Sequence, residues 1–386
     1  MRHNYQPKPL FIERMKELLG SIDYGRYKKS IEIPERKSIR VNTLKMSVSE
    51  LKKRLEAKKW KINQPFEDYP EIFIVEGKFS DENAGEEDDV CDKKETKSNN
   101  NGKKNSKVIN NSLLGGWMGT ILLNKNKKIV ALQSGELGRS MEHLLGYYYV
   151  QEIASMLPAI ALNPKPDELV LDLCAAPGSK TTQMAAMMKN KGTIIANDAN
   201  LDRIKILASN TERCAATNTI LTRNDGVNLC RKIAESNKKG GVSVRGTLVP
   251  LMFDKILVDA PCSGEGTIKS TPKTLLMWNI NTIKSLSKLQ KKLLESAIEI
   301  LKVGGEVVYS TCTHAPEENE EVLDYALKKF GKSISMEKIV LPIKCKPGIL
   351  GWAGGNYDKE VEKSCRVYPH VTNTEGFFIS KIKKLK

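Results

Sequence analysis

The sequence lacks the patterns that mark several classes of protein. None of its eight cysteines forms a C-x-x-C pair, which excludes zinc-ribbon spacing, and we expect an intracellular chain with reduced thiols. No apolar run approaches the roughly 18 residues that span a bilayer, and residues 1–19 contain no uninterrupted apolar segment of a secretory signal. We therefore expect a cytoplasmic protein, or a nuclear or nucleolar one in a eukaryote, with no membrane partner.

Histidine is also scarce, with four residues in the chain. His314 and His370 have no partners at metal-ligand spacing, so no metal site is expected. In contrast, Lys and Arg number 62 against 46 Asp and Glu, a formal net charge of +16. This excess favours a polyanion as partner, although a well-solvated lysine-rich surface is the simpler alternative. We expect a monomer.

The 386 residues suffice for two or three domains at roughly 150 residues each. The N-terminal part predicts two helices and two strands in the order of a small α+β unit, of the kind that builds ferredoxin-like sheets. The helices are expected over 10–20 and 48–60 and the strands over 38–44 and 71–77. Residues 79–113 are acidic, then basic and asparagine-rich, which is typical of a disordered polar insertion. Residues 114–137 predict strands that return to this first domain, which we bound at 1–137.

Residues 138–386 alternate short apolar runs with helical segments. Near-continuous apolar strands between helices predict a parallel sheet covered on both faces, a doubly wound α/β domain. The strands are expected over 168–173, 193–198, 218–225, 253–260, 304–312 and 376–384, and the helices over 179–190, 201–214, 281–302 and 317–330.

The turn after the first of these strands predicts a ligand site, because ligands of such sheets bind beyond the carboxyl ends of the strands. Its text, "DLCAAPGSKTTQ", offers small residues and the free amides of a helix N-terminus, but no G-x-G-x-x-G for a dinucleotide. Asp198 and Asp225 end the next two strands and are placed to reach ribose hydroxyls and an adenine edge. Any one such acid is also a common helix cap, but with Asp172 on the first strand three acids stand at successive strand ends. Together they favour S-adenosylmethionine as cofactor.

Two thiols, Cys262 and Cys312, follow two neighbouring strands of the predicted sheet. A thiolate that adds to carbon 6 of cytosine makes carbon 5 nucleophilic enough to accept a methyl group. Asp259 could hydrogen-bond the cytosine edge, and Lys180 could neutralise developing charge. A lone buried cysteine is usually inert filler, so the prediction depends on finding both thiols at the cofactor end of the sheet.

Long motifs of this chain resemble the Sun/NSUN family of RNA cytosine-5 methyltransferases, and above all its archaeal and eukaryotic tRNA or rRNA members. The matching text includes "LDLCAAPGSKTTQMA", "FDKILVDAPCSGEGT", "EVVYSTCTHAPEENEEV" and "RVYPHVTNTEGFFISKIKK". The resemblance implies a class I, Rossmann-like, seven-stranded methyltransferase domain that uses S-adenosylmethionine, preceded by a small domain similar to an RNA-recognition module.

The resemblance also implies roles for individual residues. Cys312 would attack carbon 6, and Cys262 would assist release of the methylated product. The expected cofactor contacts are Cys174, Ala175, Ala176, Pro177, Gly178, Ser179, Lys180, Asp198, Arg203, Asp225 and Asp259.

RNA is the expected partner, and a target base must be unpaired or flipped out to reach Cys312. Lysines within 51–60 and 283–292 are candidates for phosphate contacts. The chain has no extended basic tail, which favours tRNA over rRNA. Two other functions stay open from the residues alone, a DNA cytosine-5 methyltransferase in which Cys262 attacks and an RNA-binding assembly factor.

Overall fold

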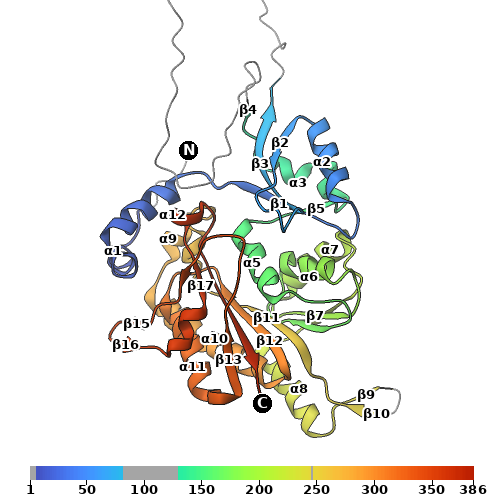
Figure 1. Cartoon of the computed structure of the whole chain (residues 1–386), viewed down its shortest axis with the longest axis vertical. Helices are drawn as coiled ribbons and strands as arrows, with labels where there is room; N and C mark the ends of the chain where they lie inside the picture. Colours follow the sequence, from blue (N-terminus) through green and yellow to red (C-terminus); the bar gives the residue numbers. More distant parts are fainter. Residues whose placement is uncertain (1–5, 81–128, 245–246) are drawn as a thin grey trace, which may run out of the picture.

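Two sheets organise the molecule (Figure 1). The computed structural model describes residues 6–80, 129–244 and 247–386. Residues 81–113, which make up most of the predicted polar insertion, and residues 114–128 of the predicted returning strands lie outside these ranges.

The large sheet has the order β14-β17-β18-β12-β11-β6-β7-β8, with β13 on β18. The five strands from β12 to β8 are parallel, and β18 runs antiparallel to β12. The strands are β6 (Leu169–Asp172), β7 (Thr193–Asp198), β8 (Thr219–Arg223), β11 (Phe253–Asp259), β12 (Leu301–Thr311), β13 (Ile334–Glu337), β14 (Lys346–Pro347), β17 (Cys365–Val367) and β18 (Phe377–Lys384). The short strands β14 and β17 extend the predicted seven strands, and the predicted α/β class is confirmed.

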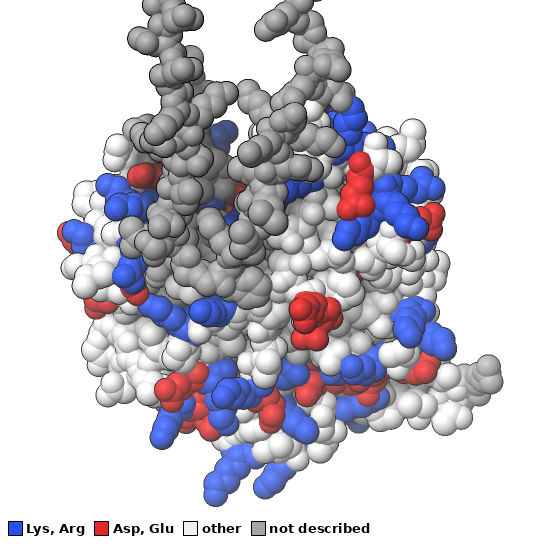
Figure 2. All heavy atoms as spheres, turned by 45° about the horizontal axis from the view of Figure 1, so that its top comes forward, with Lys and Arg blue, Asp and Glu red and all other residues white. Residues whose placement is uncertain are grey.

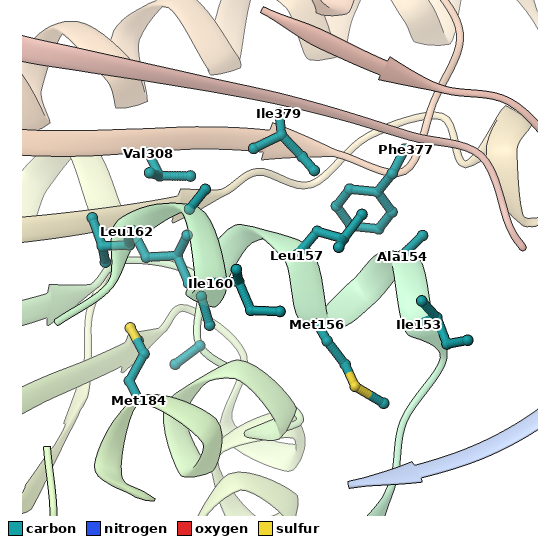
Figure 3. Close-up of a cluster of buried hydrophobic side chains, with 14 of the residues drawn as sticks. Ile153, Ala154, Met156, Leu157, Ile160, Leu162, Met184, Val308, Phe377 and Ile379 are labelled. Carbon is teal, nitrogen blue, oxygen red and sulfur yellow. The ribbon is translucent and has the colours of Figure 1, made fainter. Parts of the chain in front are cut away.

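Helices cover both faces of this sheet because successive strand residues are apolar on both sides. Val308 of β12 lies in a core with α5 and α6, whereas its neighbours Val307 and Tyr309 lie in a second core with α8, α10 and α11. Figure 3 shows α5 packed between the sheet and Met184 of α6. These helices are α5 (Ile153–Leu162), α6 (Ser179–Met187), α7 (Leu201–Arg213), α8 (Gly226–Lys238), α10 (Ile280–Glu299) and α11 (Glu320–Phe330).

The small sheet is antiparallel, with the order β2-β3-β1-β5 and β4 on β3. Because β5 pairs with β1, this sheet continues past residue 137, the domain boundary that we expected. Its elements are β1 (Lys37–Val41), α2 (Val48–Ala57), β2 (Trp60–Asn63), β3 (Ile72–Phe79), β4 (Ile129–Val130), α3 (Glu136–Arg139), α4 (Met141–Leu144) and β5 (Tyr148–Val150).

One predicted helix of this domain was too long. The helix expected over 48–60 ends at Ala57, and Trp60 instead opens β2. Lys59 adopts a positive φ of 62°, which a continuing helix does not allow. Burial of Trp60 in the core of the small domain therefore overrides the helical pattern of the lysine-rich stretch.

The N-terminal helix packs on the large domain rather than on the small sheet. Figure 1 shows α1 (Pro9–Glu32) beside α9 (Thr274–Met277) and α12 (Pro369–Thr372). Phe11 and Tyr27 of α1 share a core with Trp278, and a positive φ at Gly20 interrupts the helix. The remaining described elements are β9 (Val242–Val244), β10 (Thr247–Val249), β15 (Gly351–Trp352), β16 (Gly355–Asn356) and the 3₁₀ turns Glu265–Thr267, Pro316–Glu318, Gly331–Ser333 and Lys359–Lys363.

One buried arginine joins the two domains. Arg40 of β1 is 2% exposed and donates to Gln151 Oε1 at 3.0 Å and to Thr182 Oγ1 of α6 at 3.0 Å. Its burial lowers the pKa of the guanidinium to about 10. The small sheet is therefore attached to the helix that follows the predicted cofactor turn.

Candidate active site

The carboxyl ends of the parallel strands form one edge of the large sheet, and Asn197 ties three of them together. Its Nδ2 donates to the carbonyl oxygens of Leu173 at 3.1 Å and Asn224 at 2.9 Å. Asn197 is 1% exposed, so these bonds are shielded from water. These bonds therefore fix the turns after β6, β7 and β8 relative to one another at the predicted cofactor site.

The predicted cofactor turn over 174–180 folds tightly between β6 and α6. The Ala175 amide donates to the Asn197 carbonyl at 2.7 Å, and Gly178 has a φ of 103° where α6 begins. This φ lies in the region that side chains rarely adopt, so the turn favours glycine, and a Cβ here would also press on Leu207 Cδ1 of α7 at 2.9 Å. The N-terminal amides of α6 consequently open onto the end of the sheet.

Asp198 lies at the end of β7, as predicted, and Arg203 of α7 connects it to the cofactor turn. Asp198 Oδ1 accepts from the Asn200 amide at 3.0 Å. Its Oδ2 is buried, accepts no hydrogen bond and lies 3.4 Å from Arg203 Nη1. Arg203 Nη2 also donates to the Ala176 carbonyl. Asp198, Arg203 and the turn thus form one contiguous group.

Asp225 is placed differently. It is exposed at the start of α8, and its Oδ1 accepts from the Asn228 amide at 2.9 Å. It therefore caps this helix, and within the described residues no hydrogen bond joins it to the other predicted site residues. An adenine contact for Asp225 stays a prediction.

Asp172 was counted among the strand-end acids in the sequence but was not predicted as a site residue. It ends β6 with 1% exposure, and its Oδ2 accepts from Thr181 Oγ1 at 2.7 Å. Its Oδ1 is buried without a partner, and burial raises the pKa of this carboxyl to about 7. An acid directly before the small-residue turn was the available signal. Asp172 Oδ1 and Asp198 Oδ2, which accept no hydrogen bond from the described residues, fit the amino and hydroxyl donors of S-adenosylmethionine.

Lys180 and Asp259, predicted separately, form an ion pair. Lys180 Nζ lies 2.7 Å from Asp259 Oδ2 and 3.1 Å from Ser155 Oγ. Ser310 Oγ donates to Asp259 Oδ1 at 2.7 Å, so both carboxylate oxygens have partners. The pair crosses from α6 to the end of β11 and links the cofactor turn to the segment that carries Cys262.

The two predicted thiols meet. Cys262 Sγ and Cys312 Sγ lie 3.1 Å apart, and the Cys312 amide donates to Cys262 Sγ at 3.3 Å. This closeness follows from the register of β11 and β12, which pairs Asp259 with Ser310. The hydrogen bond with Cys312 and burial raise the pKa of Cys262 well above its ordinary value. A neutral Cys262 therefore faces Cys312.

Glycines bring a third loop to the thiols. The Gly266 amide donates to the Cys312 carbonyl at 2.9 Å, and the Gly376 amide donates to the Gly266 carbonyl at 2.9 Å. A Cβ on Gly266 would lie 2.2 Å from the Gly376 carbonyl oxygen. The loops after β11, after β12 and before β18 can approach this closely only because glycine occupies both positions.

Across the described ranges, no group of three or more His, Cys, Asp or Glu side chains is placed to hold a metal ion. In the same ranges no helix combines the length and the apolar character needed to cross a membrane.

Comparison with known protein families identifies the large domain. A family model described as 16S rRNA methyltransferase RsmB/F matches residues 159–383. The chain belongs to this family. A second model, for the N-terminal domain of 16S rRNA methyltransferase RsmF, matches residues 8–75. The predicted resemblance to Sun-family RNA cytosine-5 methyltransferases is confirmed, and with it S-adenosylmethionine as cofactor.

Relatives of this RsmB/F chain carry names for two kinds of RNA. A tRNA (cytosine(49)-C(5))-methyltransferase of Pyrococcus abyssi is 42% identical over 64% of this chain and 73% of its own length. A ribosomal RNA small subunit methyltransferase F of Aliivibrio salmonicida is 34% identical over 97% of this chain. The chain spans 63% of the length of this second relative.

Solved structures share the fold. A methyltransferase homologue from Pyrococcus horikoshii has a TM-score of 0.68 and 29% identity over 98% of this chain and all of its own. NSun6 from Pyrococcus horikoshii, solved with SFG, has a TM-score of 0.70 over the full length of both chains, with 24% identity. The similarity to these structures therefore extends over both domains of the described molecule.

Proposed function

We propose that this chain methylates carbon 5 of an unpaired cytosine in tRNA and that Cys312 is the nucleophile. The observation that supports this most directly is the pair of thiols 3.1 Å apart at the end of neighbouring strands. They lie beside the Lys180–Asp259 ion pair, whose Nζ and Oδ2 atoms are 2.7 Å apart. A single nucleophile would need one thiol, whereas an adduct that must also be broken gives the second thiol a use.

The residues act in sequence. Cys312, as thiolate, bonds to carbon 6 of the ring, and the electron pair displaced from the 5,6 double bond makes carbon 5 nucleophilic. S-adenosylmethionine supplies the methyl group that carbon 5 accepts. Cys262 assists release of the product: a base takes the carbon 5 proton, the electrons of that C–H bond restore the 5,6 double bond, and the carbon 6–sulfur bond breaks so that the Cys312 thiolate leaves. Asp259 accepts a hydrogen bond from the cytosine edge, and Lys180 offsets the charge that develops on the ring.

Several features support tRNA as the substrate. The tRNA methyltransferase of Pyrococcus abyssi is the more similar relative over the shared region, and the chain spans more of its length. Ribosomal RNA is the second candidate, because the matching family models are named for 16S rRNA and cover both domains. We further propose that the protein acts as a monomer in the cytoplasm.

A direct assay separates the two substrates. Purified protein, methyl donor and either unmodified tRNA or unmodified 16S rRNA are incubated, and the RNA is then analysed by bisulfite sequencing. We expect a single methylated position in tRNA and none when Cys312→Ala replaces the native protein. Methylation confined to 16S rRNA would contradict the tRNA proposal and leave the reaction type standing.

RNA docking in this proposal uses exposed basic side chains of both domains. Lys53 and Arg54 project from α2, and Lys284, Lys288 and Lys292 line the exposed side of α10. On the face drawn in Figure 2, Lys and Arg side chains alternate with Asp and Glu rather than forming one uniform patch. Binding that depends on such contacts weakens steeply as salt rises.

Asp198 provides a test of the cofactor site. Asp198→Asn removes the charge of a carboxylate whose Oδ2 has no hydrogen-bond partner. We expect the Kd for S-adenosylmethionine to rise about tenfold or more, as for loss of a charged hydrogen bond. Isothermal titration calorimetry measures this change. Asp202→Asn is the matched control, because that side chain is 84% exposed and pairs only with Lys205. An equal Kd for both variants would contradict the assignment.

A further inference from the structure

The turn that carries Cys262 is held on both sides by one buried pair of side chains. Gln290 Nε2 of α10 donates to the Pro261 carbonyl at 2.8 Å and to Glu318 Oε2 at 2.8 Å. The Ser263 amide donates to the same Glu318 oxygen at 3.0 Å. Gln290 and Glu318 are both 0% exposed. The residues immediately before and after Cys262 are therefore attached to a single amide–carboxyl pair.

The same pair contacts the strand that carries Cys312. Tyr309 of β12 donates its hydroxyl hydrogen to the Glu318 backbone carbonyl. Ser263 Oγ also lies 2.8 Å from Thr313 Oγ1, the residue after Cys312. Glu318 thus sits between the two segments whose thiols must keep a fixed separation.

Two oxygen atoms of this pair have no partner. Gln290 Oε1 and Glu318 Oε1 are both buried, and neither has a hydrogen-bond partner among the described residues. An amide and a protonated carboxyl satisfy each other completely, because the acid hydroxyl donates to the amide oxygen while the amide N–H donates to the acid oxygen. A proton on Glu318 would therefore supply a hydrogen-bond donor to a pair in which two buried oxygens have none.

The surroundings of Glu318 favour the protonated carboxyl on balance. Burial is the largest cause and raises its pKa to about 7; hydrogen bonds from Ser263 and Gln290 lower the pKa, and the charge of Glu265 raises it. Cys262 and Tyr309 also interact with Glu318, and neither is a cation. Ionised Glu318 in turn raises the pKa of Cys262.

We propose that Glu318 and Gln290 are the positioning residues of Cys262 and that the protonated form of Glu318 is the one competent for product release. This inference rests on the proposed function, in which Cys262 helps to break the adduct between Cys312 and the base. When Glu318 loses its proton, its carboxylate can no longer donate a hydrogen bond within the pair, and a negative charge appears beside Cys262. Decay of the protein–RNA adduct then slows, while attack by Cys312 continues.

The test follows the denaturation-resistant protein–RNA adduct after a chase with unlabelled RNA, between pH 6 and pH 8.5. Glu318→Gln keeps the acceptor for Ser263 and supplies an NH₂ group for Gln290 Oε1, so it mimics the protonated acid without titrating. We expect its adduct to decay at the native rate at pH 6. Above pH 7 we expect adduct decay to be slower in the native protein than in this variant, because only native Glu318 ionises.

Gln290→Leu tests the positioning role separately. It removes both Nε2 hydrogen bonds, so we expect adduct decay to slow about tenfold or more, while adduct formation changes little. Ser287→Ala is the matched control, since Ser287 lies on the same helix and donates to the Glu317 carbonyl at 2.6 Å, not to the Cys262 turn. We expect the adduct of this control variant to decay at the native rate.

Three outcomes would each overturn one part of the proposal. A pH profile of Glu318→Gln that is identical to the native profile would overturn the role of the proton. If a folded Gln290→Leu variant releases its adduct at the native rate, the positioning role is overturned. If that variant does not fold, the pH profile of Glu318→Gln alone decides. Absence of any adduct in Cys262→Ala would instead overturn the proposed function on which the inference rests.

Discussion

Cys312→Ala is expected to abolish methylation, and Cys262→Ala is expected to trap RNA on the protein as an adduct that survives denaturing gels. Removing a covalent nucleophile costs roughly a thousandfold or more in rate, because the uncatalysed ring carbon is a poor nucleophile. Removing the thiol that assists release leaves attack intact and blocks only the later step. Scintillation counting of labelled methyl groups and denaturing gels of labelled RNA measure the two effects.

The two variants are expected to differ in outcome, with loss of methylation in one and accumulation of the adduct in the other. The sulfur atoms lie 3.1 Å apart, and in the proposed mechanism Cys312 attacks carbon 6 whereas Cys262 acts only in the later release. Cys345→Ala serves as the control, because this free thiol is half-buried on the far side of β18 from β12. We expect native methylation in this variant.

The reverse result would be equally informative. An adduct with Cys312→Ala and none with Cys262→Ala would make the thiol after Pro261 the attacking group, as in the DNA cytosine-5 methyltransferase alternative. If the double cysteine variant fully restored growth in cells that lack the protein, an RNA-binding role without methylation would be favoured.

Arg366→Met is expected to lower the free energy of unfolding by about 3–5 kcal/mol, the usual cost of breaking a buried ion pair. Arg366 is 2% exposed and pairs with Glu320, which is 0% exposed. It also donates to the His314 carbonyl and to the Tyr368 hydroxyl, both at 3.0 Å. The variant leaves Glu320 charged and buried with no cation beside it. Urea unfolding at neutral pH measures the change.

A surface ion pair provides the comparison. Lys291 and Glu321 lie 2.7 Å apart with side chains 23% and 39% exposed, so Lys291→Met is expected to cost less than about 1 kcal/mol. Combining Arg366→Met with Glu320→Leu is expected to recover part of the stability, since no unpaired charge remains. An Arg366→Met protein as stable as Lys291→Met would show that the pair contributes little.

Much of the fold was predictable because the signals are local. Apolar runs such as 253–260 must be buried on both faces, so they predict parallel strands covered by helices. The same reasoning placed the turn at 174–180, Asp198 and both thiols at one edge of the sheet, because every parallel strand ends there. The helix over 48–60 was mispredicted at its end, where burial of Trp60 in the small core outweighs a helical pattern.

The sequence by itself determined the strands, the turns at their ends and the residue types that chemistry requires. Only the tertiary structure decided which distant groups meet: Lys180 with Asp259, Arg366 with Glu320, and Gln290 with Glu318 around Cys262. Hydrophobic periodicity reports how one segment meets water, whereas the partner of a buried polar atom depends on strand order and helix packing. A buried oxygen without a partner, as on Asp172, is likewise a property of the packed molecule.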